Sequence, residues 1–412
     1  MYARATTIWA LTTLIVSQAV ASAPTSRHEL VLDFLMVGDL QGWPNHLGDD
    51  EPAIDITLVP ARAFELGVPD EDLYRLSRIY FPRNMQSMLE YDVLFFNHPR
   101  LSFFTPEQQE MMVDFVGTEG KVSIAYPLST YAEVQIPWLN SPLSQVFPVD
   151  MEKYVYGTPQ AILDAWWENV RLRLAPGLPP VFSAFESTGI FDARIYRTSR
   201  PCHAKEGATI WLYMIDGPPA MPEAPAFISW PYGASDAWAF GIHPGEDRPQ
   251  WEKAGAWWEL IFLNICLHSN GREILSFEEG VHKRSVKTQF SYFRESASMF
   301  RGIIDFVTKL GAVPNQAEST LSQANLAKSE AEMDYLERRY EEAGERMEKA
   351  LQLVNQAMDE AKLAKERALF WIYLSEWMAT TAAALVSGVV LWWLMIRRGL
   401  YREVTTTQLR QR

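Results

Sequence analysis

Residues 91–126 read YDVLFFNHPRLSFFTPEQQEMMVDFVGTEGKVSIAY and carry the signals of a strand, a helix and a second strand. The apolar run Tyr91–Phe96 predicts a buried strand that ends at Asn97-His98-Pro99. Thr105 is a good helix N-cap and is followed by proline at the first helical position. Lys121–Tyr126 predicts the next strand. This βαβ pattern predicts a parallel sheet with helices packed on it.

Runs on both sides extend the predicted sheet. Glu29–Val37 indicates a buried strand, and Ile54–Val59 a weaker one. Later the apolar period shifts towards two, which favours the strands Ala208–Met214, Ala226–Trp230 and Ala237–Ile242. The sequence therefore predicts an α/β fold with a mostly parallel sheet.

Helices are predicted at five places in the same region. They are Asn84–Leu89, the segment that Thr105 opens, Gln160–Val170, the tryptophan-rich run Trp251–His268, and the amphipathic stretch Val281–Leu310. Gly311 and Pro314 then break the chain, which indicates a domain boundary. We expect an α/β domain over 28–275 and a helical extension over 276–314.

Several short motifs in order resemble the class I glutamine amidotransferase-like superfamily. They are Tyr80-Phe81-Pro82-Arg83-Asn84, Phe104-Thr105-Pro106-Glu107-Gln108, Gly117-Thr118-Glu119-Gly120-Lys121 and Trp230-Pro231-Tyr232-Gly233. The resemblance covers about residues 28–270. It implies a flavodoxin-like sandwich, in agreement with the βαβ pattern.

The nucleophile of that superfamily is missing. Its enzymes carry a cysteine on a sharp, glycine-flanked turn after a strand, whereas this chain has Pro127-Leu128-Ser129-Thr130 after Lys121–Tyr126. Without glycine the strained turn is hard to form, and without a thiol the usual nucleophile is lost. We therefore expect a catalytically silent domain, with Ser129 as a stand-in nucleophile in the alternative.

A second fragment supports that alternative. Phe240–Glu246 resembles the strand and His-Pro-Glu motif of the superfamily, with one extra residue before the acid. The resemblance implies His243 as general base and Glu246 as the carboxylate that orients it; a solvated loop is the other interpretation. Cys202, beside His203, has no glycine-flanked turn around it and is interpreted as a loop cysteine.

Metal and cofactor sites find little support. Asp39, Asp49, Asp50 and Glu51 follow the first strand, where ligands of parallel sheets gather, but acidic loops are more often solvated. We predict no metal and no cofactor. Cys266 lies in an apolar run and is predicted to be a core residue.

Composition narrows the class of partner. The formal net charge of −14 argues against binding nucleic acid or anionic lipid. Two cysteines in 412 residues do not form a disulfide framework.

The C-terminal part of the chain predicts a membrane span. Trp377–Ile396, WMATTAAALVSGVVLWWLMI, is an uncharged twenty-residue stretch, long enough to cross a bilayer. Five arginines and one acid follow it, so the positive-inside rule places the tail 397–412 in the cytoplasm.

The N-terminal part predicts a signal peptide over residues 1–21. Arg4 gives a short positive region, and the apolar run Thr7–Val16 that follows is too short to span a bilayer. Ala19 and Ala21 supply the small residues that signal peptidase reads, so we expect cleavage after Ala21; an uncleaved anchor is the alternative. The two ends of the chain agree on a single-pass, type I topology at the cell membrane.

A helical stalk precedes the span. Residues 317–369 contain one glycine and no proline, and apolar side chains recur at heptad spacing. This seam comprises Met333, Leu336, Tyr340, Ala343, Met347, Ala350, Val354, Ala357, Ala361, Ala364 and Ala368. It predicts an unbroken coiled coil that pairs with another copy or a related membrane protein, or that packs back on the ectodomain. Stalk and span together form one rod.

The function we predict is a binding or assembly subunit, a scaffold at the cell surface. Two alternatives stay open: an extracytoplasmic hydrolase or amidase using His243, Glu246 and Ser129, and a ligand-binding sensor.

Overall fold

A computed structural model describes residues 31–39, 48, 51–62, 68–126, 137–153, 170–192, 203–217, 219, 221–241, 249–311 and 314–409. The predicted signal peptide and nearly all of the predicted helix Gln160–Val170 lie outside these residues.

Eight strands form one sheet. They are β1 (Leu32–Asp39), β2 (Ile54–Arg62), β3 (Val93–Asn97), β4 (Val122–Tyr126), β5 (Arg171–Leu174), β6 (Thr209–Ile215), β7 (Glu223–Tyr232) and β8 (Ser235–Phe240). Their order is β2-β1-β3-β4-β8-β7-β6-β5. The pairings from β2 to β8 are parallel, and those from β8 through β7 and β6 to β5 are antiparallel. The predicted mostly parallel α/β sheet is confirmed.

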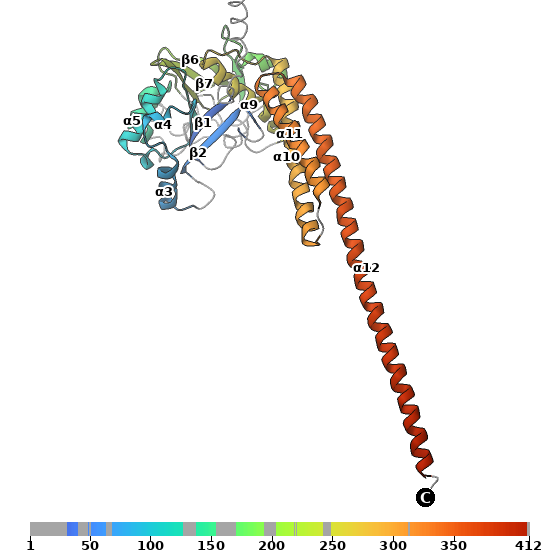
Figure 1. The fold of residues 1–412 in the computed structure, drawn as a ribbon. Helices are drawn as coiled ribbons and strands as arrows, with labels where there is room; N and C mark the ends of the chain where they lie inside the picture. Colours follow the sequence, from blue (N-terminus) through green and yellow to red (C-terminus); the bar gives the residue numbers. More distant parts are fainter. Residues whose placement is uncertain are drawn as a thin grey trace, which may run out of the picture. The chain divides into compact units, whose positions relative to one another are not determined.

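Helices accompany the sheet and continue after it (Figure 1). Before β8 come α3 (Asp70–Tyr80), α4 (Met85–Met88), α5 (Pro106–Val116) and α7 (Leu143–Val146), with short 3-10 turns η3 (Leu101–Phe103) and η5 (Ser183–Thr188). After β8 come α9 (Pro249–Ser269), α10 (Phe277–Lys309), α11 (Asn315–Leu336) and α12 (Tyr340–Leu409).

The sheet is buried on both faces. On one face, alternate residues such as Leu35, Leu94 and Ala237 join a core with Met112 and Phe115 of α5. On the other face α9 packs through aromatic contacts, since the rings of Phe95 and Phe262 have centroids 5.8 Å apart and those of Phe227 and Trp258 stack at 5.4 Å. Burial on both faces explains the continuous apolar runs of β1 and β3.

The helix after β3 begins where the sequence predicts. The Thr105 side chain accepts a hydrogen bond from the Gln108 N–H (3.3 Å), and the Gln108 side chain accepts one from the Thr105 N–H (2.9 Å). This capping box, with Pro106 at the first helical position, fixes the start of α5. Strands or helices lie at each of the other predicted segments that the structure describes.

Several elements were not predicted: strand β5, helices α3 and α7, and the turns η3 and η5. Strand β5 and helix α7 lie in a region with no clear period, and α3 lies in Asp70–Tyr80, for which we made no prediction. Three acids in its first turn, Asp70, Glu71 and Asp72, favour the helix dipole, and only Leu73 and Ser77 of α3 are buried. A short helix with so narrow a buried face gives a weak periodic signal.

The predicted stalk is not one helix. Helix α11 ends at Leu336, and α12 begins at Tyr340 after a turn in which Arg338 has a φ of 62°. The prediction of an unbroken seam from Met333 is therefore wrong between Glu337 and Arg339. The prediction that the later seam and the apolar span form one helix is confirmed, because α12 has 70 residues and is about 105 Å long at ~1.5 Å per residue.

The chain divides into two compact units. The first comprises Met1–Lys287 with Glu332–Glu341, and the second Thr288–Ala331 with Glu342–Arg412. Within the second unit, α11 runs antiparallel to α12, since Arg346 pairs with Glu330 (2.6 Å) and Thr320 donates a hydrogen bond to Glu360 (2.9 Å). Phe300 of α10 shares an apolar cluster with Ala357 and Ala361.

The apolar stripe of α12 therefore has a partner in its own chain. Ala343, Met347, Ala350, Val354, Ala357 and Ala361 are all fully buried. Beyond Ala361 no residue of α12 is buried, as far as its side chains are described. The buried part of the seam therefore packs on α10 and α11 of its own chain.

One helix in the described part of the chain is long and apolar enough to cross a membrane. It is the exposed continuation of α12, and its most apolar window has no buried residue. Leu385, Val389, Leu391 and Trp392 are each more than 60% exposed, which is consistent with a membrane anchor.

Candidate functional site

Polar side chains gather where β1, β2 and β3 end. The Arg62 guanidinium lies 3.8 Å from an Asp39 carboxylate oxygen, and both side chains are largely buried. The Asn97 amide donates a hydrogen bond to the Asp39 carbonyl oxygen (3.2 Å) and is 1% exposed. These three residues occupy the carboxyl edge of neighbouring parallel strands, where α/β proteins place their ligands. We call Asp39, Arg62, Asn97 and His98 the edge cluster.

The edge cluster lies at a topological switch point. The chain leaves β1 for β2 on one side and later enters β3 on the other. Gly38 permits the close approach, because a Cβ there would lie 1.7 Å from the Asn97 carbonyl oxygen. Next to it, His98 has a φ of 51°, uncommon for a residue with a side chain. The edge cluster thus gathers an imidazole, an amide and a largely buried ion pair at one edge of the sheet.

The residues predicted for catalysis lie outside the described part of the chain. This holds for Ser129, His243 and Glu246, and for Cys202. The strands before Ser129 and His243 are described: β4 ends at Tyr126, β8 ends at Phe240, and the two pair in parallel. Both strands therefore direct the chain to the same edge of the sheet.

The acidic residues weighed as a cation site do not converge. Asp39 ends β1, whereas Glu51 precedes β2 at the opposite edge, roughly 23 Å away at ~3.3 Å per residue. Asp49 and Asp50 lie outside the described residues. Within the described ranges no three His, Cys, Asp or Glu side chains could together hold a metal ion.

Glu51 belongs instead to a buried triad with Lys283 of α10 and Tyr335 of α11. The Lys283 ammonium donates to Glu51 Oε1 and to the Tyr335 hydroxyl, both at 2.6 Å. The Tyr335 hydroxyl donates to Glu51 Oε2 at 2.9 Å. None of the three residues is more than 4% exposed. The triad ties the segment before β2 to two helices that are distant in sequence.

Burial controls the protonation of this region. It lowers the pKa of Lys283, against the opposing effect of Glu51, and raises the pKa of Tyr335. Nearby, Lys287 donates a hydrogen bond to Glu259, yet burial raises the pKa of Glu259 to about 7. Because its pKa is raised, the Tyr335 hydroxyl stays protonated at neutral pH and can donate a hydrogen bond.

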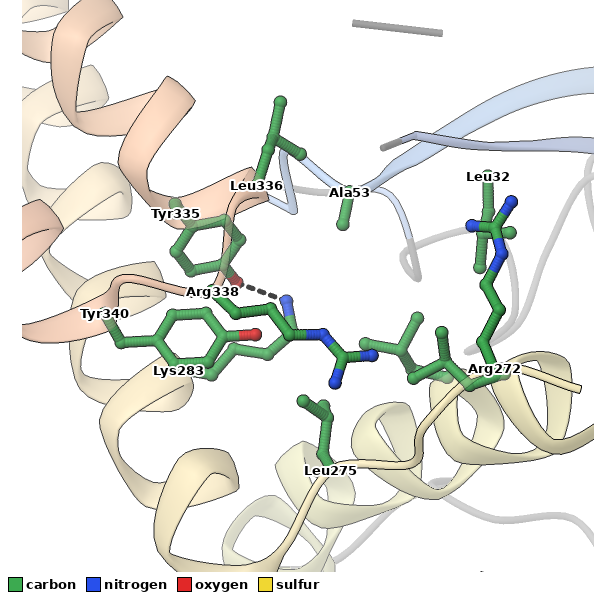
Figure 2. Close-up of a pocket in the computed structure, with 11 residues that line it drawn as sticks. Leu32, Ala53, Arg272, Leu275, Lys283, Tyr335, Leu336, Arg338 and Tyr340 are labelled. Carbon is green, nitrogen blue, oxygen red and sulfur yellow. Dashed lines mark hydrogen bonds between the residues drawn. The ribbon is translucent and has the colours of Figure 1, made fainter. Parts of the chain in front are cut away.

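A small cavity opens beside the triad (Figure 2). Its volume is about 50 Å³, and it lies at the amino ends of β1 and β2, next to Leu32 and Ala53. Side chains of α9, α10, α11 and α12, of the segment between α9 and α10 and of the turn before α12 complete its wall. Arg272, Lys283 and Arg338 line it, together with leucines.

Cys266 is a plain core residue, as predicted. It is a free thiol with no exposed surface, and burial raises its pKa far above the usual thiol value. A thiol so buried is a poor nucleophile.

Several polar residues of these sites were not predicted as functional. Asn97 and His98 carried a signal, because they follow a buried strand directly. Lys283, Tyr335 and Arg338 gave none, since each stands in a helical stretch rich in charged residues.

No family model matches the chain, and no curated protein sequence matches it. Solved structures similar to it include the cytoplasmic protein STM1381 from Salmonella typhimurium LT2, at 13% identity, a TM-score of 0.40 and 58% and 99% coverage of this chain and that one. The cytoplasmic protein STM3548 from Salmonella typhimurium has 14% identity, a TM-score of 0.41 and the same coverage. Agd3, described as a novel carbohydrate deacetylase, has 10% identity, a TM-score of 0.30 and coverage of 52% and 29%. The proposed function therefore rests on this chain's own residues.

Proposed function

We propose that this protein is a membrane-anchored, non-catalytic subunit that binds or assembles with partners at the cell surface through an amidotransferase-like α/β domain. The observation that carries the proposal is the continuity of α12. One helix contributes the buried stripe Ala343–Ala361 and then runs, with exposed side chains, through the apolar stretch 377–396. A helix apolar on every side needs lipid or other helices around it.

The sheet supports the flavodoxin-like part of the proposal. Its parallel strands lie in the order β2-β1-β3-β4-β8. This is the order of flavodoxin-like sheets, whose ligands bind beside the first and third strands. The edge cluster occupies that position and is our candidate for the binding surface.

The flanks of the span support a type I topology. Phe370, Trp371 and Tyr373 precede it and Trp377 begins it. All four aromatic residues are 61–75% exposed, as residues of an interfacial belt would be. Arg397 and Arg398 follow it. We propose the cytoplasmic tail from these arginines, and the signal peptide from the sequence of residues 1–21.

Self-association remains part of the proposal, but we place it in another part of α12 than the predicted stalk seam. Since the stripe from Ala343 to Ala361 is covered by the chain's own helices, we assign assembly to the exposed part of α12. Ala384 and Gly388 stand one turn apart there and form a small-residue face, which lets membrane helices pack closely.

Light scattering on the full chain in detergent tests assembly, and protease protection in sealed vesicles tests topology. We expect a multimer, and a cytoplasmic tail cut only when the protease is on the cytoplasmic side. A monomer at all concentrations that also retains no partner on purification would contradict the proposal.

The hydrolase alternative has one observation in its favour, the parallel pairing of β4 and β8 ahead of Ser129 and His243. A fluorophosphonate probe reacts with activated serines and tests it directly. Labelling that Ser129→Ala and His243→Ala both abolish would establish an enzyme. Absence of labelling at Ser129 is the result we expect.

A further inference from the structure

The lining of the cavity beside the buried triad combines apolar and cationic side chains. Its apolar wall consists of Leu32, Leu263, Leu267, Leu275 and Leu336. Its charged lining residues are all cations: Arg272, Lys283 and Arg338. Lys283 is paired with Glu51 at 2.6 Å, so its charge is already compensated.

Arg338 has an uncommon backbone conformation, and its side chain is hydrogen-bonded. It lies in the turn between α11 and α12 with a φ of 62°, a conformation that side-chain-bearing residues rarely adopt. One nitrogen of its guanidinium donates a hydrogen bond to the Glu273 carbonyl oxygen at 2.6 Å. Figure 2 shows the guanidinium pointing into the cavity, between Tyr340 and the leucines. A guanidinium has further donors in the same plane, suited to a carboxylate.

Tyr340 adds a second donor. The residue is 7% exposed, and its hydroxyl points into the cavity (Figure 2). No described residue forms a hydrogen bond with this hydroxyl. Burial raises the pKa of Tyr340 well above its usual value, so the group remains protonated and can donate. As a lining residue of the cavity, Tyr340 can donate this hydrogen bond to a ligand there.

We propose that this cavity binds a small aliphatic monocarboxylate, with its carboxylate on Arg338 and Tyr340 and its alkyl end on the leucines. A volume of about 50 Å³ admits only a few atoms of the ligand. An inorganic oxyanion would leave the leucine wall unused, whereas an alkyl group would bury it. Because Arg338 forms the turn from which α12 starts, the bound ligand would stabilise that turn. The proposal is independent of the scaffold function.

A ligand-observed NMR titration of the full chain in detergent tests it, with sodium propionate, sodium acetate and sodium phosphate as probes at constant ionic strength. Tyr340→Phe removes only the hydroxyl. Arg338→Asn removes the guanidinium and keeps a residue that tolerates a positive φ. Arg301→Asn, at an exposed site of α10, is the matched control.

We expect saturable propionate binding, about fourfold tighter than acetate for the added methylene. Tyr340→Phe and Arg338→Asn should each weaken it by about tenfold or more, since each removes a hydrogen bond to a charged group. Arg301→Asn should leave it unchanged. Absence of saturation, equal affinity in Tyr340→Phe, or displacement of propionate by phosphate at equal concentration would each overturn the proposal. If circular dichroism shows that Arg338→Asn is misfolded, the conservative Tyr340→Phe decides.

Discussion

The Lys283 ammonium lies 2.6 Å from Oε1 of Glu51, and both side chains are only 2% exposed. Lys283→Met leaves a buried carboxylate without its cation, and we expect it to destabilise the fold by about 3–5 kcal/mol. The melting temperature of the detergent-solubilised chain is the measurement. Lys309→Met, in the exposed pair with Asp305, is the control and should change it little.

The same pair allows a stricter test. Replacing both charges, as Glu51→Leu with Lys283→Met, should recover much of the lost stability, because no unpaired charge then remains buried. A double variant no more stable than Lys283→Met alone would mean that Lys283 acts through packing rather than charge.

A second prediction concerns the close approach of β1 and β3. Gly38→Ala places a methyl group 1.7 Å from the Asn97 carbonyl oxygen and should cost about 3 kcal/mol or disorder the edge cluster. Gly120→Ala is the matched control, since Gly120 also has a positive φ but open space around it. It should cost only about 1–2 kcal/mol. Equal melting temperatures for the two variants would show that the strands can separate without loss.

A third prediction is a pH dependence. Burial raises the pKa of Glu259 from 4.5 to about 7, so the folded chain holds a proton there that the unfolded chain releases. The stability associated with Glu259 is therefore full below about pH 4.5 and is lost as the pH rises to 7. The slope can reach about 1.4 kcal/mol per pH unit.

Melting temperatures of the wild type and Glu259→Gln, measured from pH 4.5 to 8, test this slope. Glu259→Gln should flatten the curve over that window, whatever it does to absolute stability. The exposed Glu345→Gln should leave the slope as it is in the wild type. If the melting temperature of Glu259→Gln changes with pH as that of the wild type does, a group other than Glu259 causes the pH dependence.

The sequence predicted the elements whose signals are local. The capping box at Thr105, the apolar runs of β1 and β3 and the periodic α9 and α10 all appear in the structure. The break at Glu337–Arg339 has no such signal, because LERRY contains neither glycine nor proline. It is stabilised by distant contacts: Tyr335 with Lys283 and Glu51, and Arg338 with the Glu273 carbonyl. Tertiary interactions there override helix propensity.

The residues of the candidate sites were likewise predictable only where their signal is local in the sequence. The strand before Asn97 and His98 places these two residues at an edge of the sheet. The sequence does not show, however, which strand pairs with β2, the strand that Arg62 ends. The triad joins residues 232 and 284 positions apart, a separation that no local pattern encodes.

The last prediction concerns the exposed end of α12. Gly388 has nothing within 4 Å of where a Cβ would lie, so a larger side chain there is tolerated by the single chain. If Ala384 and Gly388 form the contact between membrane helices, Gly388→Leu separates the backbones and should weaken association on the order of tenfold, or ~1.4 kcal/mol. Val386→Leu lies two residues away, on a different face of the helix, and should leave association unchanged. Light scattering across a range of detergent-to-protein ratios measures both variants, and an unaltered mass for Gly388→Leu would remove this face from the assembly.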